Sequence, residues 1–122
     1  MTPGVCLVTG ASSGIGRACA DRLAAAGWTV VGASRRPPTG VAWTPLTMDV
    51  DAGVSERIAQ LRDQHGHLDA LVTAAGFGLS GPVETTSLEQ ARAQMETNFW
   101  GTVRVVRDVL PHMREQGGGR VV

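Results

Sequence analysis

The residues best suited to chemistry in this sequence are the glycines and serines of residues 9–16, which read Thr-Gly-Ala-Ser-Ser-Gly-Ile-Gly. Gly10 permits a tight turn, while Gly14 and Gly16 let the backbone approach a ligand and a neighbouring strand closely. Backbone N–H groups at the start of a following helix, together with the helix dipole, hold an anion there. The loop therefore predicts a pyrophosphate site; the alternative is a glycine-rich loop that merely turns the chain. The residues assigned to the site are Gly10, Ser12, Ser13, Gly14, Ile15 and Gly16.

Strand and helix patterns alternate along the chain and place this loop. The apolar run Val5–Val8 predicts a buried strand, and apolar residues recur at helical spacing directly after the loop. Further strands are expected at 29–33, 43–48 and 68–74, and 120–122 resembles the opening of a fifth. Alternating strands and helices with short connections favour a parallel sheet covered by helices on both faces.

Two later helices have recognisable starts. Asp51 is expected to cap a helix that has Val54, Ile58 and Leu61 as its apolar positions and ends near Gly66. Ser87 with Gln90 forms a capping-box pattern at the start of the longest helix. The face of that longest helix expected to be buried consists of Leu88, Ala91, Met95, Phe99, Val103, Val106, Leu110 and Met113.

Composition excludes several classes of function. The 122 residues suit one domain, and 11 basic residues balance 11 acidic ones, so the basic footprint of a nucleic-acid-binding protein is missing. No apolar run approaches the roughly 20 residues that span a bilayer, and the start does not resemble a signal peptide. A cytoplasmic protein with no membrane partner is expected. Cys6 and Cys19 are expected to be reduced and buried, and no metal site is expected, because the histidines lack ligand spacing with these cysteines.

The pattern T-G-x-x-x-G-x-G resembles the short-chain dehydrogenase/reductase family. Other stretches match that family in the same order: Asp49-Val50 after the third strand, Thr73–Gly76 where the family has Asn-Asn-Ala-Gly, and Asn98 within the long helix. The resemblance covers essentially the whole chain, and residues 76–83 are similar to hydroxysteroid- and retinol-dehydrogenase-like members. The chain departs from the family where Thr73 and Ala74 replace the two asparagines.

The resemblance implies a fold. We expect a Rossmann-like, doubly wound α/β parallel sheet with strand order 3-2-1-4-5. Residues 1–122 would be a single NAD(P)-binding domain that is incomplete at the C-terminus, because the sequence ends inside the expected fifth strand. The family match also implies adenine contact by Asp49 and Val50, and close backbone approach to the cofactor by Ala75 and Gly76.

The second strand suggests which cofactor is preferred. In Rossmann proteins an acidic residue after this strand holds the ribose of NAD, whereas a basic residue suits the 2′-phosphate of NADP. Here Ser34 is followed by Arg35 and Arg36, with no carboxylate nearby, and a guanidinium can hold phosphate by paired hydrogen bonds. We therefore expect Ser34 and Arg35 to favour NADP(H), with NAD(H) as the alternative cofactor. The competing interpretation is a pair of solvated loop arginines.

The family's catalytic residues are a Ser, a Tyr, a Lys and a helix Asn, of which the resemblance assigns only Asn98. It implies that Asn98 supports a water that relays protons. The sequence has no Tyr, and all 11 of its basic residues are Arg. The resemblance thus implies the N-terminal, NADP(H)-binding part of an oxidoreductase acting on an alcohol or ketone, inactive on its own. The full-length parent would be a homodimer or homotetramer. The alternatives are a non-catalytic NADP-binding module and a non-functional fragment.

Overall fold

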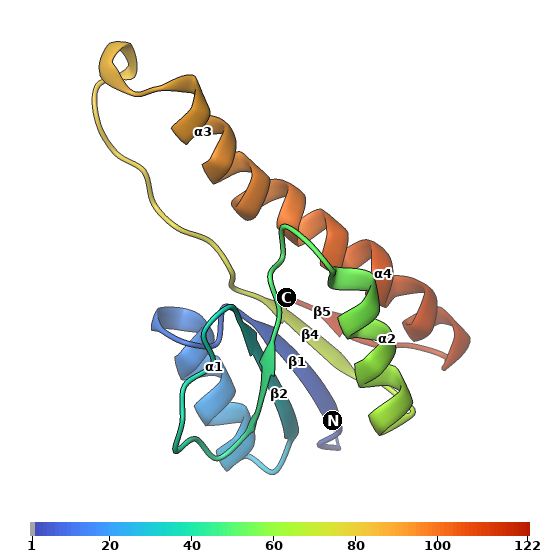
Figure 1. Cartoon of the computed structure of the whole chain (residues 1–122). Helices are drawn as coiled ribbons and strands as arrows, with labels where there is room; N and C mark the ends of the chain where they lie inside the picture. The colour runs from blue at the N-terminus through green and yellow to red at the C-terminus, as the bar shows by residue number, and fades with distance from the viewer. Residues whose placement is uncertain (1) are drawn as a thin grey trace.

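The computed structural model describes residues 2–122, which form a five-stranded parallel sheet in the order β3-β2-β1-β4-β5 (Figure 1). Its strands are β1 (Val5–Thr9), β2 (Thr29–Ser34), β3 (Thr44–Thr47), β4 (Ala70–Thr73) and β5 (Arg120–Val121). The helical elements are α1 (Gly14–Ala25), α2 (Val54–His65), the 3₁₀ turn η1 (Val83–Thr85), α3 (Leu88–Met95), the π-helical turn η2 (Glu96–Gly101) and α4 (Thr102–Glu115). The predicted strand order and the doubly wound α/β class are confirmed.

Alternate residues of β1 face two separate cores. Leu7 lies in one core with Ile58 of α2 and Val105 of α4, whereas Cys6 lies in the other with Ala20 of α1. Figure 1 shows α1 on the opposite side of the sheet from α2 and α4. A central parallel strand covered on both faces is expected to be apolar at every position, and all five residues of β1 are buried.

One predicted helix start agrees with the structure and one is wrong. Ser87 Oγ accepts a hydrogen bond from the Gln90 backbone N–H at 3.1 Å, which completes the capping box. Gly27, with φ of 92°, follows the last turn of α1 as expected of a helix-ending glycine. Asp51, however, does not cap α2: the N-cap is Gly53, with φ of 72°. The Asp51 carboxylate instead accepts from Thr97, in the long helix.

The face predicted for the long helix is right at Met113, which is buried, and at Val106, which packs against the core, but it is wrong at Leu88, Met95 and Phe99, which are exposed. Its buried residues are Gly101, Val105, Val109 and Met113, whereas Leu88 is 70% exposed. The prediction assumed uniform α-helical spacing, but the π-helical turn η2 interrupts that spacing, and from Gly101 onward the buried residues recur at every fourth position. In addition, α3 extends beyond the sheet (Figure 1), where it has no core to cover. None of the helices in residues 2–122 combines the length and the apolarity that crossing a bilayer demands.

Candidate functional site

A cavity of about 420 Å³ lies where β1, β2, β3 and β4 end. Open α/β sheets bind ligands outside the carboxyl ends of their strands, where the strand order reverses; here the reversal falls between β1 and β4. All the residues that sequence reasoning assigned to cofactor binding line this cavity except Gly16. The other lining residues, which sequence reasoning missed, are Ala33, Met48, Asp51, Ala74, Phe77 and Thr97.

The glycine loop forms one wall of the cavity, and its glycines are required by close backbone packing. Gly10 has φ of 67°, and a Cβ built on it would lie 2.6 Å from the Ala74 carbonyl oxygen. A Cβ on Gly16 would overlap the Gly10 carbonyl group, so Gly16 lies behind the loop and supports it. Gly14 opens α1 with φ of 56°, and the first N–H groups of a helix have no partner within the helix. They are therefore free to bind an anion.

The loop after β4 is tied to β1 by a hydroxyl that sequence reasoning missed. Thr9 is 2% exposed, and its Oγ1 accepts from the backbone N–H groups of Ala74 at 3.1 Å and Ala75 at 3.3 Å. Thr73, in turn, donates its hydroxyl to the Val122 carbonyl oxygen at 3.1 Å. The backbone next to the cavity is thus braced although both family asparagines are replaced. A Thr ending an otherwise apolar strand is the signal that could have indicated this.

Ser34 and Arg35 lie together at the end of β2 and line the cavity. Ser34 is only 8% exposed, and no described residue hydrogen-bonds to its Oγ. An unpaired buried hydroxyl costs roughly 1–3 kcal/mol, so a ligand oxygen at this point would be favourable. Arg35 is exposed beside it, as is Arg36, but only Arg35 lines the cavity.

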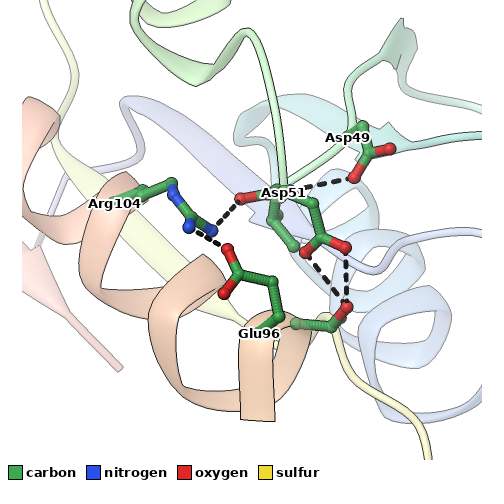
Figure 2. Close-up of polar contacts among 6 residues, drawn as sticks. Asp49, Asp51, Glu96 and Arg104 are labelled. Carbon is green, nitrogen blue, oxygen red and sulfur yellow. Dashed lines mark hydrogen bonds and ion pairs between the residues drawn. The ribbon is translucent and has the colours of Figure 1, made fainter. Parts of the chain in front are cut away.

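A third wall is formed by the loop between β3 and α2, and this loop is held by the long helix (Figure 2). The Asp51 backbone N–H donates to Asp49 Oδ1 at 2.9 Å. The Thr97 hydroxyl, from η2, lies 3.0 Å from both carboxylate oxygens of Asp51. Arg104, about two turns further along the helix, donates to the Val50 carbonyl oxygen at 3.2 Å. The contacts that Thr97 and Arg104 make join residues about fifty positions apart in sequence, so no local pattern could have indicated them.

Asn98 is exposed and does not line the cavity itself, but it contacts Phe77, which does. Its Nδ2 donates to the Phe77 carbonyl oxygen at 2.8 Å, and its Oδ1 accepts from the Phe77 N–H at 2.9 Å. The side chain is therefore used to hold the loop after β4. The Asn98 backbone carbonyl accepts from the Thr102 hydroxyl at 3.2 Å. A part for Asn98 in proton relay stays a prediction.

These features fit a dinucleotide. The close backbone packing of Gly10 and Gly16 leaves the first turn of α1 open to a pyrophosphate. The unpaired Ser34 hydroxyl and the Arg35 guanidinium lie where β2 ends, which suits a ribose and its phosphate. Ile15 is 78% exposed on the cavity wall, an apolar surface that a bound ligand would cover.

Comparison with known proteins agrees with this geometry. The family model described as short chain dehydrogenase matches residues 4–122. A 3-ketodihydrosphingosine reductase from Bacteroides thetaiotaomicron is 37% identical over 125 residues, which cover 100% of this chain and 46% of that protein. Human 17-beta-hydroxysteroid dehydrogenase type 1 is 34% identical over 137 residues, covering 97% of this chain and 41% of that protein.

Among solved structures, the actinorhodin polyketide ketoreductase with NADPH superposes with a TM-score of 0.87 at 31% identity. The match covers 98% of this chain and 51% of that one, so the chain spans about half the length of the proteins it resembles. The fold, the glycine loop and the match over residues 4–122 agree: this chain belongs to the short-chain dehydrogenase family.

Proposed function

We propose that the chain is the NADP(H)-binding part of an oxidoreductase that transfers hydride between a nicotinamide cofactor and an alcohol or ketone. The observation that carries the proposal is the placement of Arg35 and the unpaired Ser34 hydroxyl on the same cavity wall at the end of β2. A guanidinium next to a buried hydroxyl is suited to the 2′-phosphate that distinguishes NADP from NAD. Membership of the family supports a nicotinamide cofactor in general.

Each wall of the cavity has a separate task in this proposal. The loop from Gly10 to Gly16 binds the pyrophosphate through backbone N–H groups, and Asp49 with Val50 contacts the adenine. Ala75 and Gly76 allow the nicotinamide half to approach the backbone. The cofactor supplies the hydride chemistry when bound, and the protein supplies binding, orientation and electrostatics. Asn98 keeps the Phe77 backbone in place beside that half of the cavity.

The substrate class is proposed from the relatives. The 3-ketodihydrosphingosine reductase and the polyketide ketoreductase are both named as reductases, which supports a small-molecule ketone or the corresponding alcohol. The competing proposal is a non-catalytic NADP-binding module. It is favoured by one observation, namely that these 122 residues contain no Tyr and no Lys to act as proton donor and its partner.

The experiment is a comparison of two dissociation constants for the purified chain, measured by cofactor fluorescence. NADPH should bind at least roughly tenfold more tightly than NADH, as one charge-assisted hydrogen bond to the extra phosphate predicts. Equal affinities would overturn the proposed preference for NADP(H), but the proposed cofactor site would still stand. Failure to bind either cofactor would overturn the proposed site itself.

A further inference from the structure

The loop that contains Asp49, Val50 and Asp51 is attached to the long helix at three points, although the two segments lie about fifty residues apart in sequence. Thr97 donates to the Asp51 carboxylate, and Arg104 donates to the Val50 carbonyl oxygen. The third point is Gly101, where an added Cβ would lie 2.6 Å from Val50 Cγ2. The helix therefore approaches this loop as closely as its backbone allows.

Arg104 is itself held in place by an ion pair. Its Nη2 bonds to Glu96 while its Nη1 donates to Val50 (Figure 2). The guanidinium is a planar, rigid fork, so fixing one nitrogen on Glu96 directs the other. The two side chains are 36% and 44% exposed, and ion pairs this exposed contribute little stability. Orientation of the guanidinium is what the pair supplies.

The contact with Val50 determines the orientation of a whole peptide group. The Val50 carbonyl and the Asp51 N–H belong to one planar trans peptide, so they point in opposite directions. When Arg104 binds the carbonyl on one side, the N–H is directed to the other side. That N–H donates to Asp49 Oδ1 at 2.9 Å. A continuous path of contacts thus leads from Glu96 through Arg104 to the Asp49 carboxylate.

We propose that Arg104, oriented by Glu96, is a positioning residue that sets the Asp49 carboxylate for the adenine group of NADP(H). This inference rests on the proposed cofactor site and extends it to a residue outside the cavity wall. A loop held in its binding conformation before the ligand arrives loses less conformational entropy on binding. The effect should therefore be confined to ligands that carry an adenine.

The test measures dissociation constants of two half-cofactors, adenosine 2′,5′-bisphosphate and reduced nicotinamide mononucleotide, together with NADPH. Arg104→Met should weaken the binding of adenosine 2′,5′-bisphosphate and of NADPH by roughly three- to tenfold. This is the effect expected from losing a partly exposed hydrogen bond that involves a charged group. Binding of the nicotinamide half should change less than about twofold, since its site lies elsewhere in the cavity. Arg104→Lys keeps one donor and should recover part of the loss.

Arg114→Met, at an exposed position near the end of the same helix, is the matched control and should leave all three dissociation constants unchanged.

Two further variants separate positioning from general destabilisation. In an Asp49→Ala background, Arg104→Met should cause no additional loss, because coupled residues show non-additive effects. Glu96→Gln keeps the side-chain length and should cause a smaller loss of affinity for the same adenine-containing ligands. If circular dichroism shows that Arg104→Met does not fold, Glu96→Gln takes its place in the test.

The outcomes distinguish the inference from the proposal on which it rests. Suppose that the unmodified chain binds NADPH. The positioning role is then wrong if Arg104→Met weakens the binding of both half-cofactors equally, or if it weakens the binding of neither. Additive losses with Asp49→Ala would also overturn it. If the unmodified chain binds neither NADPH nor adenosine 2′,5′-bisphosphate, the proposed function fails and the inference fails with it.

Discussion

The side-chain amide of Asn98 pairs with the backbone of Phe77, donating to its carbonyl oxygen at 2.8 Å and accepting from its N–H at 2.9 Å. This pairing joins the π-helical turn of the long helix to the loop that follows β4. It gives Asn98 an architectural role in this chain alongside the proton-relay role that the family resemblance implies. The two roles predict different consequences of substitution.

Asn98→Ala should destabilise the chain by about 0.5–1.5 kcal/mol, the usual cost of losing partly exposed hydrogen bonds. In the full-length parent, kcat should fall more than NADPH affinity, because the lost contacts lie beside the nicotinamide half of the cavity. Urea unfolding and steady-state kinetics measure the two effects. Gln94→Ala, which removes only a 3.3 Å contact to the same Phe77 carbonyl, is the control. Retention of wild-type kcat by a folded Asn98→Ala protein would exclude the relay role.

Arg35→Ala should weaken NADPH binding by roughly tenfold to a hundredfold and leave NADH binding almost unchanged. The reason is that a hydrogen bond to a charged group contributes about 1.5–3 kcal/mol, and only NADPH carries the 2′-phosphate. Arg36→Ala removes the same charge from the next, equally exposed position and should have a much smaller effect. Equal losses for both cofactors would show that Arg35 does not recognise the phosphate.

Gly16→Ala should destabilise the fold by about 1–3 kcal/mol, a typical cost of overpacking, and weaken NADPH binding. The added Cβ meets the backbone carbonyl of Gly10, which can yield only if the whole loop moves. Gly78→Ala is the matched control, since a Cβ there has no described atom within 4 Å and the backbone is not left-handed. Thermal unfolding of the two variants should therefore differ clearly. Similar melting temperatures would contradict the close packing of the glycine loop.

Stability should fall as the pH rises above about 9. Burial raises the pKa of the Cys6 thiol to about 11, with the nearby Cys19 adding to the shift, whereas the unfolded thiol titrates near 8.5. The folded state therefore binds this proton more tightly, so the stabilisation is full below the unfolded pKa and is lost as the pH approaches 11. No Tyr or Lys titrates in this window, because the chain contains neither.

Urea unfolding between pH 8 and 11 measures this dependence. Cys6→Ala should be less stable at neutral pH because Cys6 is fully buried, but its stability should decline less over that range. An unchanged slope would refute the assignment to Cys6. In the unmodified protein at pH 8, the half-buried Cys19 should react with a thiol reagent well before Cys6.

The 122-residue chain should bind NADPH without oxidising it in the presence of ketones. Arg cannot act as the proton donor near neutral pH, since its guanidinium group stays protonated in proteins. Positioned acid–base catalysis alone contributes typically 10²–10⁴-fold. Loss of NADPH absorbance over a panel of ketones is the measurement, with chain-free buffer as the blank. Turnover that follows the protein through repurification would mean that a catalytic group exists among these residues.

Local pattern and family resemblance were sufficient for the arrangement of the sheet and for most of the cavity wall. The apolar run of β1 and the glycine spacing of residues 10–16 act over a few neighbouring positions, so they can be recognised along the chain. Together with the residues after β2, β3 and β4, most of residues 10–16 line the cavity that the structure shows at the carboxyl ends of the strands. The capping box at Ser87 is equally local and was also predicted correctly.

Only the tertiary structure decided how the long helix meets the rest of the molecule. The turn η2 interrupts the uniform helical spacing, so the sequence pattern indicated Met113 correctly but missed the core residues Val105 and Val109. Asp51 turned out to accept from Thr97 instead of capping α2, and Arg104 reaches Val50. These contacts join side chains about fifty residues apart, and the free energy that selects them comes from packing two loops and a helix together. No short stretch of sequence contains that information.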